Sequence, residues 1–330
     1  MQKAPLRRGL SRFPAAADCS FPRFGFNACM TRSENLTGAL LMAGSVMAFA
    51  TSDTFLKLIA GELPIYEILF LRGVLTSIAL LVIAQRAGVL RRAVPRADKW
   101  RIALRCLAEI GASYFFFNAL FRMPLANVIA ILQVAPLSIT LAAALVYREP
   151  LGWRRLTAIM AGFAGVMLIV RPGAEGFTVY SLYALASVGC VTVRDLCTRR
   201  LGRDVPSVLV SLVTSVVIMT FFGLASLGEE WVTPTARQTG LIAAAALFVV
   251  GGYLSAIMVM RVGEIAFVSP FRYASLIWAL LLGWAVFGDW PLPLTLLGAG
   301  IVVGSGVFTL YREARLGLVK KPGVPPLHPR

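Results

Sequence analysis

The sequence predicts an all-α integral membrane protein in which ten transmembrane helices form two inverted five-helix repeats. Three observations lead to this fold class. The chain of 330 residues is 58% hydrophobic and has a mean hydropathy of +0.77. Charged residues make up only 15% of it, whereas soluble domains usually carry about a quarter. An aspartate with a proline eleven positions later occurs in both halves, as Asp53 with Pro64 and as Asp195 with Pro206.

The apolar segments are helices rather than strands. Strands of a membrane barrel alternate polar and apolar residues, but runs such as Leu241–Val250 are apolar throughout. A helix needs about 20 apolar residues to cross the hydrocarbon core of a bilayer. Ten segments qualify, namely 36–58, 65–85, 102–121, 125–146, 153–170, 178–198, 207–227, 239–260, 264–287 and 293–311.

The two halves also match toward their ends. Pro150 precedes the fifth segment and Pro291 the tenth, and Gly165 and Gly306 follow these prolines at equal distances. The predicted repeats are residues 36–172 and 178–312. Residues 1–35 are expected to be a disordered cytoplasmic tail, unless translation begins at Met30, and residues 313–330 a second cytoplasmic tail.

An odd number of helices in each repeat makes the second copy enter the bilayer from the opposite side, as in inverted-repeat transporters. Loop charges agree with this arrangement, because short loops rich in Lys and Arg stay in the cytoplasm. With the N-terminus inside, 24 of the 32 Lys and Arg residues fall on the cytoplasmic side and only Arg122, Arg171 and Arg237 in outer loops. Both termini are therefore predicted to be cytoplasmic.

The same distribution explains the net charge of +16 without a nucleic-acid partner, because the charges fall in alternate loops rather than on one face. The five cysteines show no metal-ligand spacing, and His328, the only histidine, lies in the C-terminal tail. No glycine loop ending in Lys-Ser/Thr, which would bind ATP, is present. We expect neither a metal nor a cofactor, and a gradient rather than ATP as the driving force.

The chain resembles ten-helix members of the drug/metabolite transporter superfamily that carry two EamA domains. The motifs that carry the resemblance are FLRG at 70–73, REPLGWRRLTAIMAGFAGVMLIVRPG at 148–173 and SPFRYASLIWALLLGWAVFGDWPLPLTLLGAGIVVGSG at 269–306. The resemblance implies a central cavity lined by the first, third, fourth, sixth, eighth and ninth helices. It also implies a small organic metabolite as substrate. The segments SDTFLK and SPFRYASLIWALLLGW resemble those of riboflavin importers in particular.

Charges within membrane helices mark candidate sites, because each costs about 2.5 to 3.5 kcal/mol on insertion scales. Arg272 follows Pro270, a residue that frees a backbone carbonyl. It either binds substrate, pairs with Glu264 or an acidic residue on a neighbouring helix, or extends to the membrane interface. Arg72 is expected to pair with Asp53 or Glu67. Arg105 and Glu109 have the spacing of an ion pair within one helix.

The mirrored aspartates Asp53 and Asp195 either latch the two gates or mark helix ends against the headgroups, and Asp195 is the better placed for a proton relay. Amides and aromatic rings are the other candidates, because amides read the edges of a heterocycle and rings stack on its face. The expected substrate-binding residues are Asn118, Gln133, Arg272, Tyr114, Tyr253, Tyr273 and Trp278.

These observations predict a secondary transporter of the bacterial inner membrane that takes up riboflavin by alternating access. Export of amino acids or other metabolites is the alternative. An intramembrane enzyme would need a clustered acid/base or metal set, and a scaffold would not need polar residues within its helices. The expected partners are a small-molecule metabolite and the bilayer, with a homodimer left open and no nucleic acid.

Overall fold

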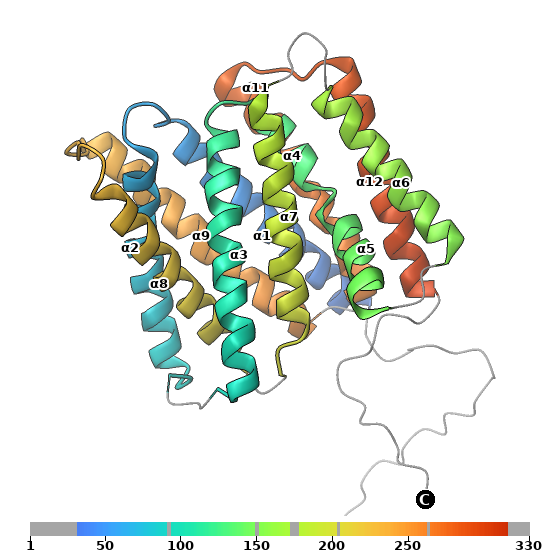
Figure 1. Cartoon of the computed structure of the whole chain (residues 1–330), viewed down its shortest axis with the longest axis horizontal. Coiled ribbons are helices and arrows are strands. Elements are labelled where there is room, and N and C mark those ends of the chain that lie inside the picture. Colours follow the sequence, from blue (N-terminus) through green and yellow to red (C-terminus); the bar gives the residue numbers. More distant parts are fainter. Residues whose placement is uncertain are drawn as a thin grey trace, which may run out of the picture.

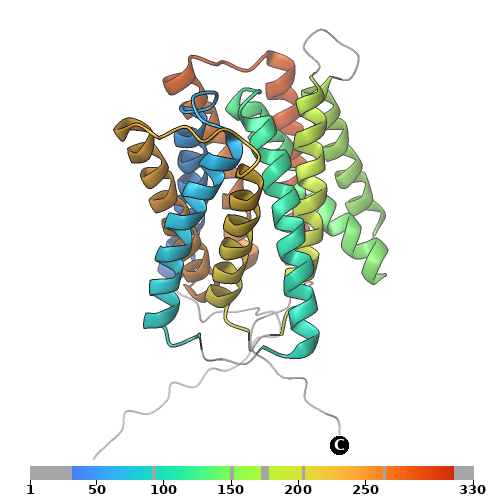
Figure 2. The same cartoon turned by 60° about the vertical axis from the view of Figure 1, so that its left-hand side comes forward.

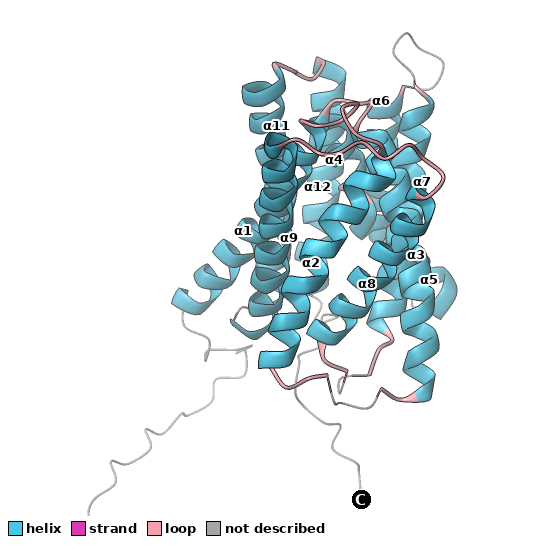
Figure 3. Cartoon of the chain, turned by 90° about the vertical axis from the view of Figure 1, so that its left-hand side faces the viewer, coloured by secondary structure: helices cyan, strands magenta, loops and turns pink. Residues whose placement is uncertain are grey.

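A computed structural model describes residues 32–90, 94–148, 152–171, 178–202, 205–262 and 265–315. Its regular structure is helical throughout these ranges, and the only β contact described is an isolated bridge between Ala60 and Leu63 (Figure 3). The helices are α1 (Arg32–Lys57), α2 (Ile65–Arg86), α3 (Arg96–Leu120), α4 (Leu125–Leu132), α5 (Ala135–Tyr147), α6 (Trp153–Val170), α7 (Val179–Arg199), α8 (Ser207–Ser226), α9 (Ala236–Val262), α10 (Ile265–Val268), the 3₁₀ helix η1 (Ser269–Tyr273), α11 (Ala274–Phe287) and α12 (Pro293–Arg315).

The predicted fold class is confirmed, and each of the ten predicted segments is helical. Eight spans within the described residues are long and apolar enough to cross a membrane by length and composition. The two remaining helices, α3 and α7, carry more polar residues. Two of the ten predicted segments are broken. The fourth divides into α4 and α5, a break that the apolar pattern did not predict. The ninth divides into α10, η1 and α11.

Local sequence explains many helix ends. Pro64, Pro95, Pro124 and Pro206 directly precede α2, α3, α4 and α8, where a missing backbone N–H costs nothing and a fixed φ favours the first turn. The fourth helix of each repeat ends alike, because Arg148 after α5 and Gly288 after α11 both adopt the left-handed conformation. This conformation is sterically unfavourable for the side chain of Arg148, whereas Gly288 adopts it without a steric clash.

The helices pair across the two repeats. The most extensive contacts join α1 to α9, α3 to α7, α2 to α8 and α6 to α12, and each pair takes one helix from each half of the chain. Figures 1 and 2 show α2 and α8 together on one flank of the bundle and α6 and α12 on the other. The two halves are therefore intertwined and do not form separate domains.

The repeats are inverted, as predicted. We call the face at which α1 begins and α12 ends the terminal face, and the opposite one the distal face (Figure 1). Pro64 precedes α2 at the distal face, whereas its counterpart Pro206 precedes α8 at the terminal face. Equivalent positions of the two repeats thus lie on opposite sides of the bundle.

Large apolar side chains cover the outside of the bundle, as expected for a protein solvated by lipid. Leu40, Leu145 and Leu247 are 65%, 72% and 71% exposed. Inside, small residues allow close helix packing. A side-chain carbon added at Gly298 of α12 would stand 2.9 Å from an Ile169 side-chain carbon and would also meet the Gly165 carbonyl of α6.

Candidate functional site

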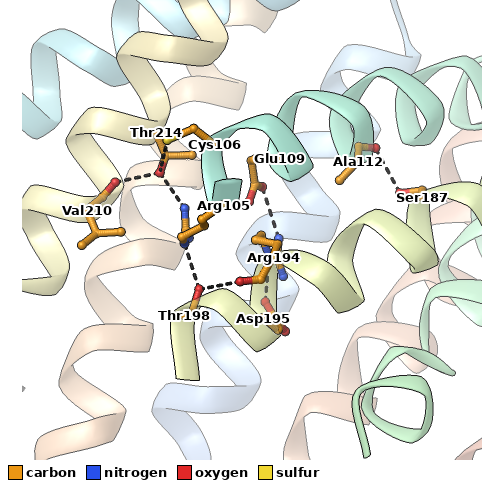
Figure 4. Close-up of polar contacts among 10 residues, drawn as sticks. All are labelled: Arg105, Cys106, Glu109, Ala112, Ser187, Arg194, Asp195, Thr198, Val210 and Thr214. Carbon is orange, nitrogen blue, oxygen red and sulfur yellow. Dashed lines mark hydrogen bonds and ion pairs between the residues drawn. The ribbon is translucent and has the colours of Figure 1, made fainter. Parts of the chain in front are cut away.

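A network of charged side chains joins the two repeats inside the bundle. Arg194 of α7 donates from Nε to Asp195 at 2.7 Å and from Nη1 to Glu109 of α3 at 3.2 Å (Figure 4). Charges inside a membrane pair with one another because an isolated charge in lipid is costly. The two least apolar helices, α3 and α7, therefore face each other and satisfy each other's polar groups.

Arg105 extends this network toward α8. Its Nε donates to Thr198 at 2.9 Å, and its Nη1 donates to Thr214 (Figure 4). The predicted ion pair between Arg105 and Glu109 is wrong, because Glu109 pairs with Arg194 on the neighbouring helix. The spacing along α3 allowed the contact, but partners from α7 and α8 lie closer to each group.

Asp53 and Arg72 are neighbours without a direct bond. Arg72 lies 4.7 Å from the centre of the Phe117 ring, an attractive cation–π geometry. It interacts electrostatically with Asp53, Glu109 and Tyr253. The alternative partner Glu67 instead accepts a hydrogen bond from the Val232 backbone N–H at 3.2 Å.

These side chains line an internal space. Asp53, Arg72, Arg194 and Tyr253 lie deep among the helices, yet each retains accessible surface. A side chain that is both deep and accessible borders an internal space. The four residues belong to α1, α2, α7 and α9, and therefore to both repeats.

The two broken helices contact each other. The chain between α4 and α5 bends at Gln133, whose amide nitrogen lies 3.5 Å from the Arg272 carbonyl in η1, a long hydrogen bond. Trp278 of α11 donates to Thr51 of α1 at 2.9 Å. The Arg272 side chain is half-buried, and Glu264, its alternative partner, lies outside the described residues. The structure thus brings Gln133 to the backbone of Arg272, and it places Trp278 against α1.

The other predicted residues are more dispersed. Asn118 donates to the Tyr114 carbonyl at 2.9 Å and accepts from Arg122 at 3.1 Å, near the distal end of α3. The Tyr114 ring packs with Tyr66 and Tyr183 at 6.4 and 6.3 Å between ring centres. Tyr273 is 5% exposed, and its ring fills the space that a side chain at position 306 of α12 would take.

Sequence reasoning underestimated Glu109 and Arg194, which form the centre of the network. Glu109 was expected to pair with Arg105 on its own helix, and Arg194 was given no role. The signal that could have revealed them is the low hydropathy of their two helices, because charges within two predicted spans need partners on another helix.

A basic residue and an aromatic ring contact each other across the repeats at each face. At the distal face, Lys57 at the end of α1 donates to the Leu120 and Met123 carbonyls and lies 5.5 Å from the centre of the Phe287 ring at the end of α11. At the terminal face, Arg200 after α7 lies 3.8 Å from the centre of the Tyr147 ring at the end of α5.

The terminal contact is reinforced by the Tyr147 hydroxyl, which donates to the Leu196 carbonyl at 3.1 Å. We call Lys57–Phe287 the distal latch and Tyr147–Arg200 the terminal latch. Both repeats contribute to each, and the aromatic residues end corresponding helices. The contacts at the two faces are thus made by basic residues that follow Asp53 and Asp195, rather than by the aspartates themselves.

A family model agrees with this architecture. The model of the EamA-like transporter family matches residues 36–171 and again residues 178–311. One solved crystal structure has a TM-score of 0.58 to this chain at 22% sequence identity. The match covers 86% of this chain and 98% of the chain in that crystal structure. That likeness supports the fold alone.

Curated relatives are transporters of different metabolites. A riboflavin transporter of Vibrio cholerae is 27% identical over 289 residues, which cover 85% of this chain and 95% of the relative. An S-adenosylmethionine uptake transporter of Rickettsia bellii is 23% identical over 82% of this chain and 92% of its own. A pseudopaline exporter of Pseudomonas aeruginosa is 23% identical over 81% and 93%.

Proposed function

The chain belongs to the EamA-like transporter family, and we propose that it is a secondary transporter that takes up riboflavin by alternating access. The observation that carries the proposal is the charged internal space between the repeats, with one cross-repeat latch at each face. A protein that opens this space to one side at a time must break one latch while the other holds. The inverted repeat supplies the two alternative arrangements.

The substrate site is proposed where the broken helices meet the internal space. Gln133, Arg272 and Trp278 would supply an amide, a guanidinium and an indole there, and Arg72 and Tyr253 would supply a second guanidinium and a phenol from α2 and α9. Amide and guanidinium groups suit the polar edge of a flavin ring, and aromatic side chains suit its face. The similarity to a riboflavin transporter supports this choice over other metabolites.

Tyr114, Asn118 and Tyr273 have supporting roles in this proposal. Asn118 and Tyr114 belong to the distal part of α3, where a substrate would enter, and Tyr273 packs η1 against α12. Removing any of the three should therefore impair transport less than removing Gln133 or Arg272.

We also propose that the protein lies in a bacterial inner membrane with both termini in the cytoplasm. The excess of Lys and Arg at the terminal face supports this orientation. A reporter that is active only in the periplasm, fused after Arg330, should be inactive. The same reporter inserted in the distal loop after Gly228 should be active, and the opposite pattern would reverse the orientation.

Uptake of labelled riboflavin into cells that cannot synthesise it tests the function. Expression of this chain should accelerate uptake and restore growth at low external riboflavin, and Gln133→Leu should abolish both. Gln85→Leu is the matched control, because Gln85 is an exposed amide at the terminal end of α2.

The alternative is export, which similarity to the pseudopaline exporter supports. Cells preloaded with labelled riboflavin or amino acids distinguish the two directions. Uptake that is equal with and without the protein, together with faster efflux, would replace the import proposal by the export one.

A further inference from the structure

The two mirrored aspartates, which the repeat makes equivalent in sequence, have different surroundings. Asp195 is bound by Arg194 at 2.7 Å. Asp53 makes no hydrogen bond or ion pair with any part of the chain that the structure describes, although it lies deep among the helices and retains accessible surface. Ionised Asp53 therefore has no direct partner, which is costly inside a membrane.

The charged neighbours of Asp53 have other contacts. Arg72 on α2 acts on it through space but stacks on Phe117, and Lys57, one turn along α1, belongs to the distal latch. The helices α10 and α11, which also pack against α1, carry no titratable residue. The remaining titratable groups on elements packed against α1 are Tyr253 and Arg237 of α9, Arg272 and Tyr273 of η1, and Arg261 of α9, whose side chain lies outside the described residues.

The geometry suits a proton better than a metal ion. Metal ions such as Ca²⁺ need several oxygen ligands, and the described residues contain no group of three or more His, Cys, Asp or Glu side chains that could hold one. The hydroxyls of Thr51 and Thr54 beside Asp53 donate to the backbone carbonyls of Met47 and Ala50, whereas the buried Ser52 hydroxyl has no partner among the described residues. A single carboxylate without a partner can be neutralised by one proton.

We propose that Asp53 binds the proton that couples transport to the pH gradient. This inference rests on the proposed transport function and goes beyond it, because it names the coupling ion and its site. A hydronium ion at one face loses one O–H bond and becomes water, an O–H bond forms at the Asp53 carboxylate and its charge falls to zero. At the other face this O–H bond breaks, and a water molecule takes the proton as hydronium.

Arg72 links proton binding to substrate binding. While Asp53 is ionised, its negative charge offsets the positive charge of Arg72. Protonation removes that offset and leaves the guanidinium free to attract a polar or anionic group of the substrate. Proton and substrate then enter together, which is the order that uptake requires.

Infrared spectroscopy tests the carboxyl group without any substrate. The purified protein should show a protonated-carboxyl band that disappears as the pH is raised. Asp53→Asn should lack this band and Asp53→Glu should retain it at a shifted frequency. Asp195→Asn should keep the band unchanged, because the Asp195 carboxylate already has a direct partner in Arg194. A band that survives in Asp53→Asn, with the variant still monodisperse, would overturn the proposal.

Proteoliposomes test the coupling. Wild-type protein should exchange labelled riboflavin at equal pH and accumulate it when the outside is acidic, whereas Asp53→Asn should exchange but no longer respond to the gradient. Asp195→Asn should slow exchange but keep the ratio of rates with and without a gradient. Wild-type exchange that ignores the gradient would refute coupling at Asp53. Absence of any exchange would instead refute riboflavin as the substrate, and the infrared result would still decide the carboxyl group.

Discussion

At the scale of residues, the interior charges determine which helices must stay together. Arg194 holds two carboxylates, one on its own helix and one on α3. Removing one member of a buried ion pair is costly, because the remaining charge stays in a low-dielectric environment without compensation. Arg194 therefore contributes to stability chiefly through the carboxylates that it neutralises.

Arg194→Ala should consequently lower the stability of the protein in detergent by about 3 kcal/mol. Arg199→Ala, a change of the same kind at an exposed position of the same helix, should have little effect. The midpoints of thermal unfolding measure both. If the two variants lost equal stability, the contacts of Arg194 would not contribute to it.

Glu62 in the distal loop between α1 and α2 gives a pH-dependent prediction. Hydrogen bonds from Gln238 and Arg237 lower the pKa of Glu62 below its ordinary value. The stability that these contacts provide is present above the ordinary glutamate pKa of about 4.3. It is lost as the pH falls through the lowered pKa, because the protonated carboxyl binds Arg237 and Gln238 less strongly.

The unfolding midpoint of the wild type should therefore fall more steeply on acidification below about pH 4.3 than that of Glu62→Gln. Other carboxylates titrate equally in both proteins, so the difference between the two curves isolates Glu62. Parallel curves would mean that the contact with α9 adds no stability.

At the scale of elements, the helices differ in what holds them. The pair of α3 and α7 is joined by ion pairs and hydroxyls, whereas α6 and α12 approach closely through glycines. Lipid provides no hydrophobic drive between helices, so close backbone approach and polar contacts have to provide the attraction. The breaks in the fourth and ninth helices place Gln133 beside the Arg272 carbonyl.

Gly298→Ala should separate α6 from α12, because the added carbon would meet the Gly165 carbonyl and the side chains of Ile169 and Leu168. We expect a loss of about 1 to 3 kcal/mol, the usual cost of overpacking. Gly300→Ala is the matched control on the same helix, because a carbon there meets nothing within 4 Å. Thermal unfolding should show destabilisation for the first variant only.

At the scale of the whole molecule, the inverted repeat supplies two equivalent latches on opposite faces. Each joins a basic residue at the end of the first helix of one repeat to an aromatic ring at the end of the fourth helix of the other. An exposed cation–π contact is worth about 0.5 to 1 kcal/mol. Loss of one latch should shift the balance between outward-open and inward-open forms without unfolding the protein.

Phe287→Ala should make a cysteine at position 253 react faster with an impermeant thiol reagent added at the distal face, by roughly two- to fivefold. Tyr147→Ala should have the opposite effect and favour reaction from the terminal face. The measurement uses a background in which the five native cysteines are replaced. Phe308→Ala, an exposed ring on α12, serves as the control and should change neither rate.

The sequence predicted many of the residues of the candidate site, but it predicted fewer of the contacts that these residues make. The sequence pointed to Gln133, Arg272 and Trp278. The structure brings Gln133 to the Arg272 carbonyl and places Trp278 against Thr51 of α1. The sequence also pointed to Asn118 and Tyr273. In the structure, Asn118 accepts a hydrogen bond from Arg122, and the Tyr273 ring packs against position 306 of α12. A helix period indicates which residues share a face, but it does not indicate which neighbour that face meets.

The sequence by itself determined the membrane setting, the ten helices and their inversion. Hydropathy identifies each helix from its own residues, and the loop charges and the odd number of helices in each repeat give its direction across the membrane. Only the tertiary structure decided the partners: Glu109 binds Arg194 rather than Arg105, and the latches are Lys57 and Arg200 rather than the mirrored aspartates. Interactions inside a membrane depend on which helices become neighbours, and that choice follows from the packing of the whole bundle.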